Sequence, residues 1–354
     1  MIKIVTIVGA RPQFVKAAAV SRVFDQYEQI QEVIIHTGQH FDKNMSDIFF
    51  NELGIPKPHY NLSINSLGHG AMTGRMLESI EEVLLKEKPN WVLVYGDTNS
   101  TIAGALAAKK LHIKVAHVEA GLRSYNTNMP EEINRILTDR ISDVLFCPTD
   151  QAVKNLQKEG YNNSESKIVK SGDVMQDAAV YYTSLSKKPN FDIPSEFILL
   201  TIHRAENTDD LFRLKRMIKS LNSIHHKMPI LWIAHPRTKK IIERENINIE
   251  FAQIDPIGYL EMIYLLQHCK MVMTDSGGLQ KEAFFFKKNC ITLRDETEWI
   301  ELIDGGFNTL VGSDPEKILS AFEQTNLKVN IFDVDLYGNG MASKVIAQSL
   351  LDEN

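Results

Sequence analysis

The sequence predicts an α/β protein built from two Rossmann-like, doubly wound domains that face a cleft. Short apolar runs rich in β-branched residues alternate with helix-spaced segments almost from end to end, as expected of parallel sheets buried on both faces. The 354 residues suffice for two domains of common size. A polar stretch with two prolines, residues 184–195, interrupts the alternation once, and we interpret it as the domain linker.

The first domain is predicted to cover residues 1–183. Its strands are the apolar runs at 3–8, 33–36, 91–95, 115–118, 144–147 and 168–170. Apolar residues that recur every three or four positions predict the helices between them, at 14–27, 72–86, 101–111, 131–141 and 151–159. This order predicts one parallel sheet, with the functional loops at the carboxyl ends of its strands.

The second domain is predicted at residues 196–340, where the same alternation restarts. Its strands are expected at 197–202, 230–234, 251–254, 271–274 and 291–293, and its helices at 211–225, 259–268, 279–286 and 315–324. A last helical pattern at 342–351 belongs to the C-terminal segment 341–354. We expect this segment to pack back on the first domain.

Composition narrows the class of protein and the type of partner. The net charge of -6 and the lack of a Lys/Arg block argue against nucleic-acid and membrane-surface partners. Three scattered cysteines without a CxxC pair fit a reducing compartment and argue against a zinc site. The apolar N-terminal run is too short for a signal peptide, and no run approaches membrane-spanning length. We therefore expect a cytoplasmic protein.

The stretch 271–282, MVMTDSGGLQKE, predicts an anion site. A strand that ends in a small-residue turn and opens a helix directs unpaired backbone N–H groups and the helix dipole at one point. Ser276 can cap this helix, and Gly277 and Gly278 let an anion approach the backbone. Glu282 can accept a hydrogen bond from a ribose hydroxyl. We interpret the stretch as a phosphate or diphosphate site; an ordinary strand-to-helix turn is the alternative.

The loop after the first strand adds two cations to this picture. Arg11 and Lys16 flank the predicted start of a helix, and both can reach an anion there, although isolated basic residues are more often solvated surface charge. No GxGxxG follows the strand, which disfavours a dinucleotide site.

Carboxylates gather at other strand ends of the first domain. Asp97 follows one strand, Glu119 follows the next, and Glu131 opens a helix. Asp97 alone could simply cap a helix, and Glu131 with its neighbour Glu132 could be ordinary partners of a helix dipole. Together in one cleft, Asp97, Glu119 and Glu131 would form a cluster of like charges that supplies acids and bases.

The second domain contributes a histidine at its first strand end. His203 can pair with a phosphate or transfer a proton, although a lone loop histidine more often does neither. Arg294 follows a later strand, and its segment can close over a ligand.

Motifs along nearly the whole chain resemble the non-hydrolysing UDP-N-acetylglucosamine 2-epimerase family. In chain order these are GARPQFVK, HTGQH, YGDTNS, HVEAGLRS, PEEINR, TIHRAEN, HPR, DSGGLQKE and RDETEW. The resemblance implies a glycosyltransferase-B-like fold, a UDP-sugar substrate, a homodimer, and no cofactor or obligatory metal. It implies catalytic roles for Asp97, Glu119, Glu131 and His203. Substrate-binding roles are implied for Arg11, Lys16, Gln39, Arg123, Asn134, Arg135, Ser276, Gly277, Gly278, Glu282 and Arg294.

Two departures bear on the substrate and on regulation. Many members read GTRPE where this chain reads GARPQ, and the GARPQF form resembles the subgroup that epimerises UDP-2,3-diacetamido-2,3-dideoxy-glucuronate. The segment 41–46 departs from the pattern associated with an allosteric substrate site near Gln39.

The chemistry of a 2-acetamido sugar explains why acids, bases and an anion site occur together. Its C2 proton is not next to a carbonyl, so loss of UDP from C1 must assist its removal. The resemblance therefore implies elimination of UDP to a glycal and its re-addition. The alternatives are a hydrolysing epimerase, whose first loop tends to read GTRADYG, a retaining glycosyltransferase of the same fold, and a catalytically silent sugar-nucleotide sensor.

Overall fold

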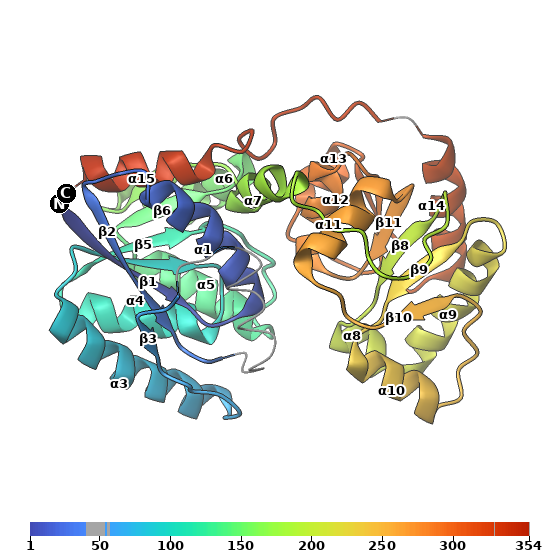
Figure 1. Ribbon diagram of the computed structural model, residues 1–354, viewed down its shortest axis with the longest axis horizontal. Coiled ribbons are helices and arrows are strands. Elements are labelled where there is room, and N and C mark those ends of the chain that lie inside the picture. The colour runs from blue at the N-terminus through green and yellow to red at the C-terminus, as the bar shows by residue number, and fades with distance from the viewer. Residues whose placement is uncertain (40–53, 55–56, 329, 354) are drawn as a thin grey trace. The chain divides into compact units, whose positions relative to one another are not determined.

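The structure of the protein, a computed structural model, describes residues 1–39, 54, 57–328 and 330–353, without the side chain of Arg11. The chain divides into two compact units: unit 1 is Met1–Ala178 with Asp335–Asn354, and unit 2 is Ala179–Val334. Each unit is built on a parallel sheet with helices on both faces (Figure 1). The predicted α/β class with two doubly wound sheets is confirmed.

The sheet of unit 1 has seven strands in the order β3-β2-β1-β4-β5-β6-β7. The strands are β1 (Ile2–Val8), β2 (Ile30–His36), β3 (Tyr60–Asn61), β4 (Trp91–Tyr95), β5 (Lys114–Val118), β6 (Val144–Cys147) and β7 (Lys167–Lys170). The order of the chain reverses between β1 and β4, which is the topology of a Rossmann sheet. The sequence predicted six of these strands and missed β3, because its two residues are too few for a period to show.

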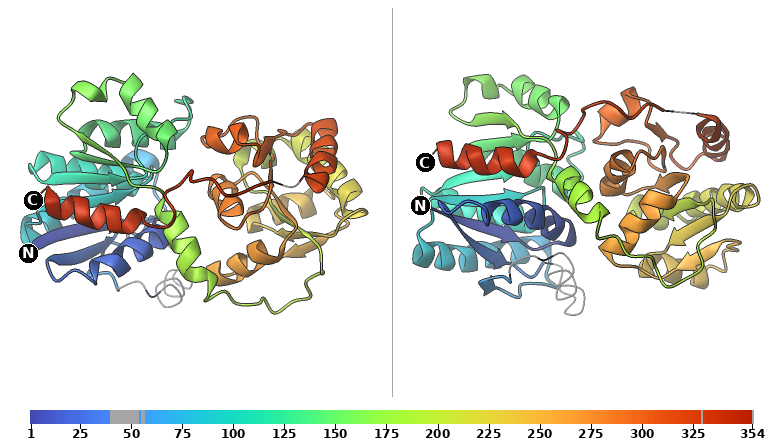
Figure 2. Two further views of the ribbon diagram at one scale, coloured as in Figure 1. Left: turned by 90° about the horizontal axis from the view of Figure 1, so that it is seen from above. Right: turned by 45° about the horizontal axis from the view of Figure 1, so that its top comes forward.

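Helices cover both faces of this sheet. α3 (His69–Glu87), α4 (Asn99–Lys110) and α5 (Pro130–Ile141) lie on one face, and α1 (Arg11–Phe24) lies on the other (Figure 1). α15 (Ala342–Asp352) runs beside α1, as two further views show (Figure 2). α6 (Asp150–Lys158) and the short helix η1 (Tyr161–Asn163) adjoin β6 and β7, and α7 (Val174–Thr183) spans the border of the two units.

The core of unit 1 follows from the two-residue period of its strands. Val5 and Ile7 of β1 and Val92 and Val94 of β4 all point to the face that α3 and α4 cover. The buried face of α4 consists largely of alanines, which lets the helix approach the strands closely. The runs are apolar on both faces because both faces are covered.

Unit 2 repeats this architecture with the six-stranded order β10-β9-β8-β11-β12-β13. Its strands are β8 (Ile198–Thr201), β9 (Ile230–Ile233), β10 (Ala252–Ile254), β11 (Met271–Thr274), β12 (Cys290–Thr292) and β13 (Asn308–Leu310). Its helices are α8 (Ala205–Thr208), α9 (Leu211–His225), α10 (Pro236–Arg244), α11 (Tyr259–His268), α12 (Gly277–Phe285), α13 (Ile300–Asp304) and α14 (Pro315–Leu327). β13, with a single apolar residue, and the five-residue α13 were not predicted.

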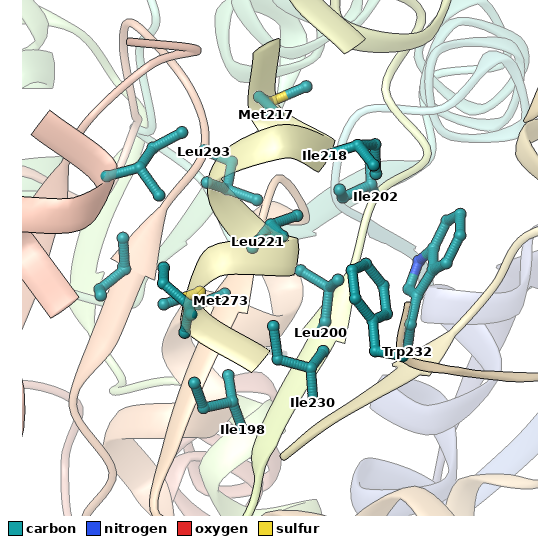
Figure 3. Packing of buried hydrophobic residues seen from close by; sticks show 14 of the residues in the cluster. Ile198, Leu200, Ile202, Met217, Ile218, Leu221, Ile230, Trp232, Met273 and Leu293 are labelled. Carbon is teal, nitrogen blue, oxygen red and sulfur yellow. The ribbon is translucent and has the colours of Figure 1, made fainter. Parts of the chain in front are cut away.

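Alternate residues of β8 enter two different cores. Ile198 and Leu200 pack against α9, where Met217 and Leu221 meet them (Figure 3). Leu199, which lies between them in sequence, joins the cluster built by α11 and α12 on the opposite face. Both faces of the strand are therefore buried, which fixes the position of its carboxyl end.

Side chains and prolines define where several helices begin. The Thr98 side chain accepts a hydrogen bond from the Thr101 N–H at the start of α4, and Asp210 caps α9 in the same way. Pro130 and Pro315 lie in the first turns of α5 and α14, where their missing N–H costs no hydrogen bond. Within the described ranges, no helix is both long and apolar enough to cross a membrane.

Candidate active site

The carboxyl ends of β1, β4 and β5 lie side by side in unit 1, because these strands are neighbours in a parallel sheet. Open α/β sheets bind ligands at the edge where the strand order reverses, which here lies between β1 and β4. The loops that begin at Gly9, Gly96 and Glu119 leave the sheet at this edge. The predicted carboxylates Asp97 and Glu119 therefore belong to one side of one sheet.

Gln13 joins the ends of β1 and β4. Its side chain is buried, and its Oε1 accepts hydrogen bonds from the N–H groups of Gly9 and Ala10 at 2.8 and 3.0 Å. Its Nε2 donates to the Tyr95 carbonyl at 2.8 Å and contacts the Thr98 hydroxyl at 3.0 Å. The Gln of GARPQ thus fixes the backbone on both sides of the strand-order reversal. Sequence reasoning marked this residue only as a departure from a pattern.

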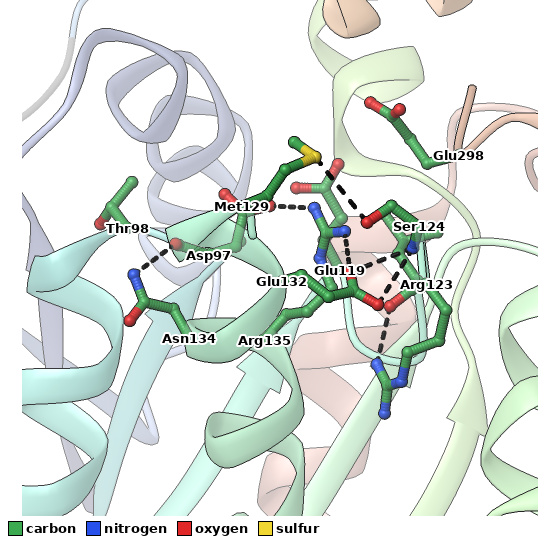
Figure 4. A network of polar contacts seen from close by, with 12 residues as sticks. Asp97, Thr98, Glu119, Arg123, Ser124, Met129, Glu132, Asn134, Arg135 and Glu298 are labelled. Atoms are coloured by element: carbon green, nitrogen blue, oxygen red, sulfur yellow. Dashed lines mark hydrogen bonds and ion pairs between the residues drawn. The ribbon is translucent and has the colours of Figure 1, made fainter. Parts of the chain in front are cut away.

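Asp97 is partly buried at the end of β4 and forms an ion pair with Nη2 of Arg135 (Figure 4). Nη1 of the same guanidinium binds Oε2 of Glu132 at 2.6 Å. Asn134 donates from its amide to the Asp97 carbonyl at 2.9 Å. Two neighbouring residues of α5 therefore hold Asp97, one through its carboxylate and one through its backbone.

Glu119 forms an ion pair with Nζ of Lys16, which comes from α1. A Cβ atom placed on Gly96 would lie 3.3 Å from Oε2 of Glu119 and 3.4 Å from Nζ of Lys16. The ion pair thus lies against the backbone of the residue that precedes Asp97. The structure brings three predicted site residues, Lys16, Asp97 and Glu119, together at one place.

Glu119 also has an unusual backbone conformation. Its φ is +75°, in the left-handed region that residues other than glycine rarely adopt. Its N–H and that of Ala120 both donate to the Phe146 carbonyl, at 3.1 and 3.0 Å. Strain of this kind costs of order 1–3 kcal/mol and is typically found at functional sites.

Glu131 and Glu132 lie at the start of α5 but have different surroundings. Glu131 is exposed, and no hydrogen bond or ion pair joins its carboxylate to another residue in the described part of the chain. Glu132 is fully buried and accepts from the N–H groups of Ser124 and Tyr125, at 3.0 and 2.8 Å, besides binding Arg135. Glu132 is thus the carboxylate that holds the loop before α5 in place, and the sequence analysis did not single it out.

Arg123 does not fit the predicted substrate-binding role. Its side chain is completely buried, and its Nε and Nη2 donate to Glu159 at 2.6 and 2.8 Å. Its Nη1 donates to Oδ2 of Asp139 and to the Leu122 carbonyl, both at 2.7 Å. Because these bonds occupy the guanidinium inside the unit, we assign Arg123 a structural role instead.

Gln39 lies at the same edge, and its Oε1 accepts from the N–H and the hydroxyl of Ser100 at 3.1 and 2.8 Å. The segment 41–46, on which the expectation about an allosteric site depends, lies outside the described residues, as does the side chain of Arg11.

In unit 2, α12 begins directly after β11, as the predicted anion site requires. Ser276 is the residue before the helix, and its hydroxyl faces the Leu279 N–H at 3.5 Å. Gly278 is exposed, and a Cβ atom built on it would meet nothing within 4 Å. Gly277 and Glu282 are buried in the helix. The first turn of α12 is therefore open at Gly278, and the backbone N–H groups of a first turn have no partner within the helix.

Asp275 connects this helix start to the loop after β8. Its carboxylate is fully buried and accepts from the N–H groups of His203 and Arg204 at 3.0 Å each. The Asn207 side chain donates to it at 3.1 Å. β8 and β11 are neighbours at the strand-order reversal of unit 2, so Asp275 fixes the loop that carries His203.

His203 is exposed, and its Nδ1 lies 3.3 Å from Oδ1 of Asp275. Its ring centroid is 6.2 Å from that of His235. Desolvation lowers the pKa of His203, the charge of Asp275 opposes this effect, and the charges of Arg204 and His235 add to it. The ring is therefore favoured in its neutral form, which can accept or donate a proton.

Arg294 is buried after β12, where Nη1 binds Oε2 of Glu298 at 2.9 Å and Nε lies 3.7 Å from Oε1 of Glu206. It thus ties the loop after β12 to α8. Over the described residues, no group of three or more His, Cys, Asp or Glu side chains is arranged to hold a metal ion.

Known proteins resemble this chain over nearly its whole length. The family model described as UDP-N-acetylglucosamine 2-epimerase matches residues 22–351. A Pseudomonas aeruginosa protein named UDP-2,3-diacetamido-2,3-dideoxy-D-glucuronate 2-epimerase is 56% identical over 98% of this chain and 99% of its own. A Methanocaldococcus jannaschii UDP-N-acetylglucosamine 2-epimerase is 44% identical over 98% of each chain.

Solved structures agree over the full length. The crystal structure of the Methanocaldococcus jannaschii enzyme in complex with UDP-GlcNAc and UDP has a TM-score of 0.90 at 43% identity and covers 99% of each chain. The Neisseria meningitidis enzyme bound to UDP-GlcNAc has a TM-score of 0.89 at 31% identity, over 99% of this chain and 100% of that one.

Proposed function

The chain belongs to the UDP-N-acetylglucosamine 2-epimerase family, and we propose that it inverts C2 of a UDP-2-acetamido sugar without net release of UDP. One observation of the structure carries the proposal. Asp97 and Glu119 stand at one edge of one sheet, and each forms an ion pair with a cation from another element. An epimerisation needs several acid and base groups close to the sugar ring, and these two carboxylates can supply part of that set.

The proposed reaction has two halves. First the C1–O bond breaks with its electron pair leaving on UDP, and a carboxylate takes the C2 proton, which gives a 2-acetamidoglucal. Then UDP adds back to C1 while a proton arrives at C2 from the opposite face. Asp97 and Glu131 are the proposed pair of acid and base groups, and Glu119 tunes the pair or protonates the glycal.

The nucleotide is assigned to unit 2. The start of α12 comprises Ser276, Gly277 and Gly278 and is open at Gly278, which supports a diphosphate site, because the N–H groups at a helix start and the helix dipole stabilise negative charge. Glu282 is assigned to a ribose hydroxyl, and His203 to the departing phosphate. Arg11, Lys16, Gln39, Asn134 and Arg135 are assigned to substrate binding, as the family resemblance implies.

We propose UDP-2,3-diacetamido-2,3-dideoxy-glucuronate as the first substrate to test. The identity to the Pseudomonas aeruginosa enzyme of that name, 56%, exceeds the 44% identity to the Methanocaldococcus jannaschii UDP-N-acetylglucosamine 2-epimerase. UDP-N-acetylglucosamine is the second candidate. A cytoplasmic homodimer that supplies a cell-surface polysaccharide, such as a capsule or O-antigen, completes the proposal and follows from the family resemblance.

A proton NMR time course in deuterated water tests the reaction and the substrate together. We expect deuterium at C2, appearance of the manno epimer and retention of UDP with one of the two sugars. The variant Asp97→Asn serves as the matched inactive control. Accumulation of free UDP would instead identify a hydrolysing epimerase, and the absence of exchange with both sugars would refute the proposed substrates.

A further inference from the structure

His117 occupies a buried position next to the proposed catalytic groups. It is the fourth residue of β5, lies two residues before Glu119, and has a completely buried side chain. Its Nε2 lies 2.7 Å from the Gly96 carbonyl oxygen, and its Nδ1 lies 2.7 Å from Oδ1 of Asp139. A carbonyl oxygen only accepts hydrogen bonds, so Nε2 must carry a proton.

The state of Asp139 decides whether Nδ1 carries a proton as well. Oδ2 of Asp139 accepts from the Gly121 N–H at 3.1 Å and from Nη1 of Arg123 at 2.7 Å. Burial raises the pKa of Asp139, but the hydrogen bonds and charges of His117 and Arg123 outweigh it, so the pKa falls below its ordinary value. An ionised Asp139 has no proton to donate, and therefore Nδ1 of His117 donates to it.

The other groups around this cluster leave its charges balanced. Arg123 is held by Asp139 and by Glu159 of α6. Burial raises the pKa of the Cys147 thiol of β6 well above its ordinary value and that of Tyr161 in η1 to about 12, so both stay uncharged. The cluster thus holds two cations and two carboxylates. A charged imidazole ring is compatible with burial here because it is paired and hydrogen-bonded on both nitrogens.

The same bonds hold the backbone at both proposed catalytic carboxylates. Gly96, whose carbonyl His117 binds, immediately precedes Asp97 and has a φ of +61°. Asp139 holds the segment of Glu119 at two points: His117 lies two residues before Glu119, and Gly121 lies two residues after it. Glu119 itself has a φ of +75°. A strained conformation persists only where its surroundings impose it, and this network surrounds it.

We propose that His117 is a positioning residue whose two ring N–H groups fix the backbone that carries Asp97 and Glu119. The proposal rests on the proposed roles of these two carboxylates. It assigns His117 no contact with substrate; the residue acts through Gly96 and Asp139. The ring is a double donor, and no other natural side chain of its size and shape donates in both directions.

Two substitutions separate the two bonds. His117→Asn places an amide N–H near the position of Nδ1, so it retains the bond to Asp139 and loses the bond to Gly96. His117→Gln places an amide N–H near Nε2, so it retains the bond to Gly96 and loses the bond to Asp139. His112→Asn, at an exposed histidine in the turn before β5, is the matched control.

We expect both His117 variants to lower kcat by on the order of 100-fold, because small displacements of catalytic groups cost about that much. The Kd for UDP should stay within about two-fold of the unmodified protein, because the nucleotide is assigned to unit 2. A merely structural loss would lower kcat and raise the Kd for UDP, together with a smaller folded fraction. Unchanged kcat in both variants, while the unmodified protein epimerises its substrate, would overturn the inference and leave the proposed function intact.

The protonation of the ring is measured on the unmodified protein. In protein labelled with ¹⁵N-histidine at pH 8, His117 should show two N–H correlations from one ring, and these should vanish in either variant. A single N–H from this ring would overturn the inference whether or not the variants fold. Absence of epimerase activity with every UDP-sugar tested would refute the proposed function and with it the assigned roles, while the NMR result would still report the charge of His117.

Discussion

Glu32→Gln is the prediction that the structure supports in most detail, and it concerns the stability of unit 1. Glu32 lies on β2, and its carboxyl group forms a hydrogen bond with the Thr6 hydroxyl of β1. Burial raises the pKa of Glu32 from 4.5 to about 7, and the hydroxyls of Ser21 and Thr6 offset only part of this rise. The folded protein therefore binds a proton at Glu32 more tightly than the unfolded chain does.

The sign and size of the effect follow from proton linkage. A carboxyl group whose pKa is raised on folding contributes its full stability below pH 4.5 and loses it as the pH rises through about 7. The full shift corresponds to roughly 3 kcal/mol. Because the residue keeps some contact with solvent, screening reduces this value, and we expect roughly 1 to 3 kcal/mol. Gln keeps a neutral hydrogen-bonding group at this position and cannot ionise, so the variant does not lose this stability as the pH rises.

Urea unfolding followed by circular dichroism at pH 5, 6, 7 and 8 measures the effect. At pH 8, Glu32→Gln should be more stable than the unmodified protein by roughly 1 to 3 kcal/mol. The difference should shrink towards pH 5. Glu28→Gln removes an exposed carboxylate just before β2 and should show no such trend. A difference that does not vary with pH, or a variant less stable at pH 8, would refute the assigned burial of a protonated Glu32.

Three further predictions concern the candidate site. Asp97→Asn should lower kcat by about 10² to 10⁴ with the Kd for UDP unchanged, because it removes an acid or base group but not the anion site; a variant with full turnover would exclude Asp97 from the chemistry. Glu282→Ala should weaken UDP binding about ten-fold in calorimetry, and unaltered binding would exclude the ribose contact. Asp275→Ala removes the acceptor of the His203 and Arg204 N–H groups and of the Asn207 amide. It should therefore lower the free energy of unfolding by about 2 to 5 kcal/mol and weaken UDP binding. The control Asp304→Ala, at an exposed carboxylate, should change neither quantity.

The sequence predicted most of the fold because its strands are buried on both faces. Such strands read as continuous apolar runs, and β4 and β11 were predicted with the bounds that the structure has. β3, with two residues, is too short for a period to show, and α13, with five residues, is shorter than two helical turns. α10 was missed for a different reason, since its HPR start was interpreted only as a family motif.

For the site, position in the fold was easier to predict than contacts. Strand ends marked Asp97 and Glu119 correctly as neighbours in space, because residues after adjacent parallel strands share one edge. Nothing in the spacing says that Glu132 rather than Glu131 is buried, because that depends on the loop 124–125 folding back on α5. The burial of Arg123 likewise depends on Glu159, which is 36 residues away in the sequence.

The proposed reaction sets a requirement on the protonation of the catalytic carboxylates. Epimerisation with a base on each face begins with one group ionised and the other protonated, and ends with the two states exchanged. The contacts of Asp97 with Arg135 and of Glu119 with Lys16 are ion pairs only while both carboxylates are charged. Glu131 has no such cation in the described structure and stays exposed to solvent. The two members of the proposed acid and base pair therefore differ in their surroundings, because Asp97 is held by a cation and Glu131 faces solvent.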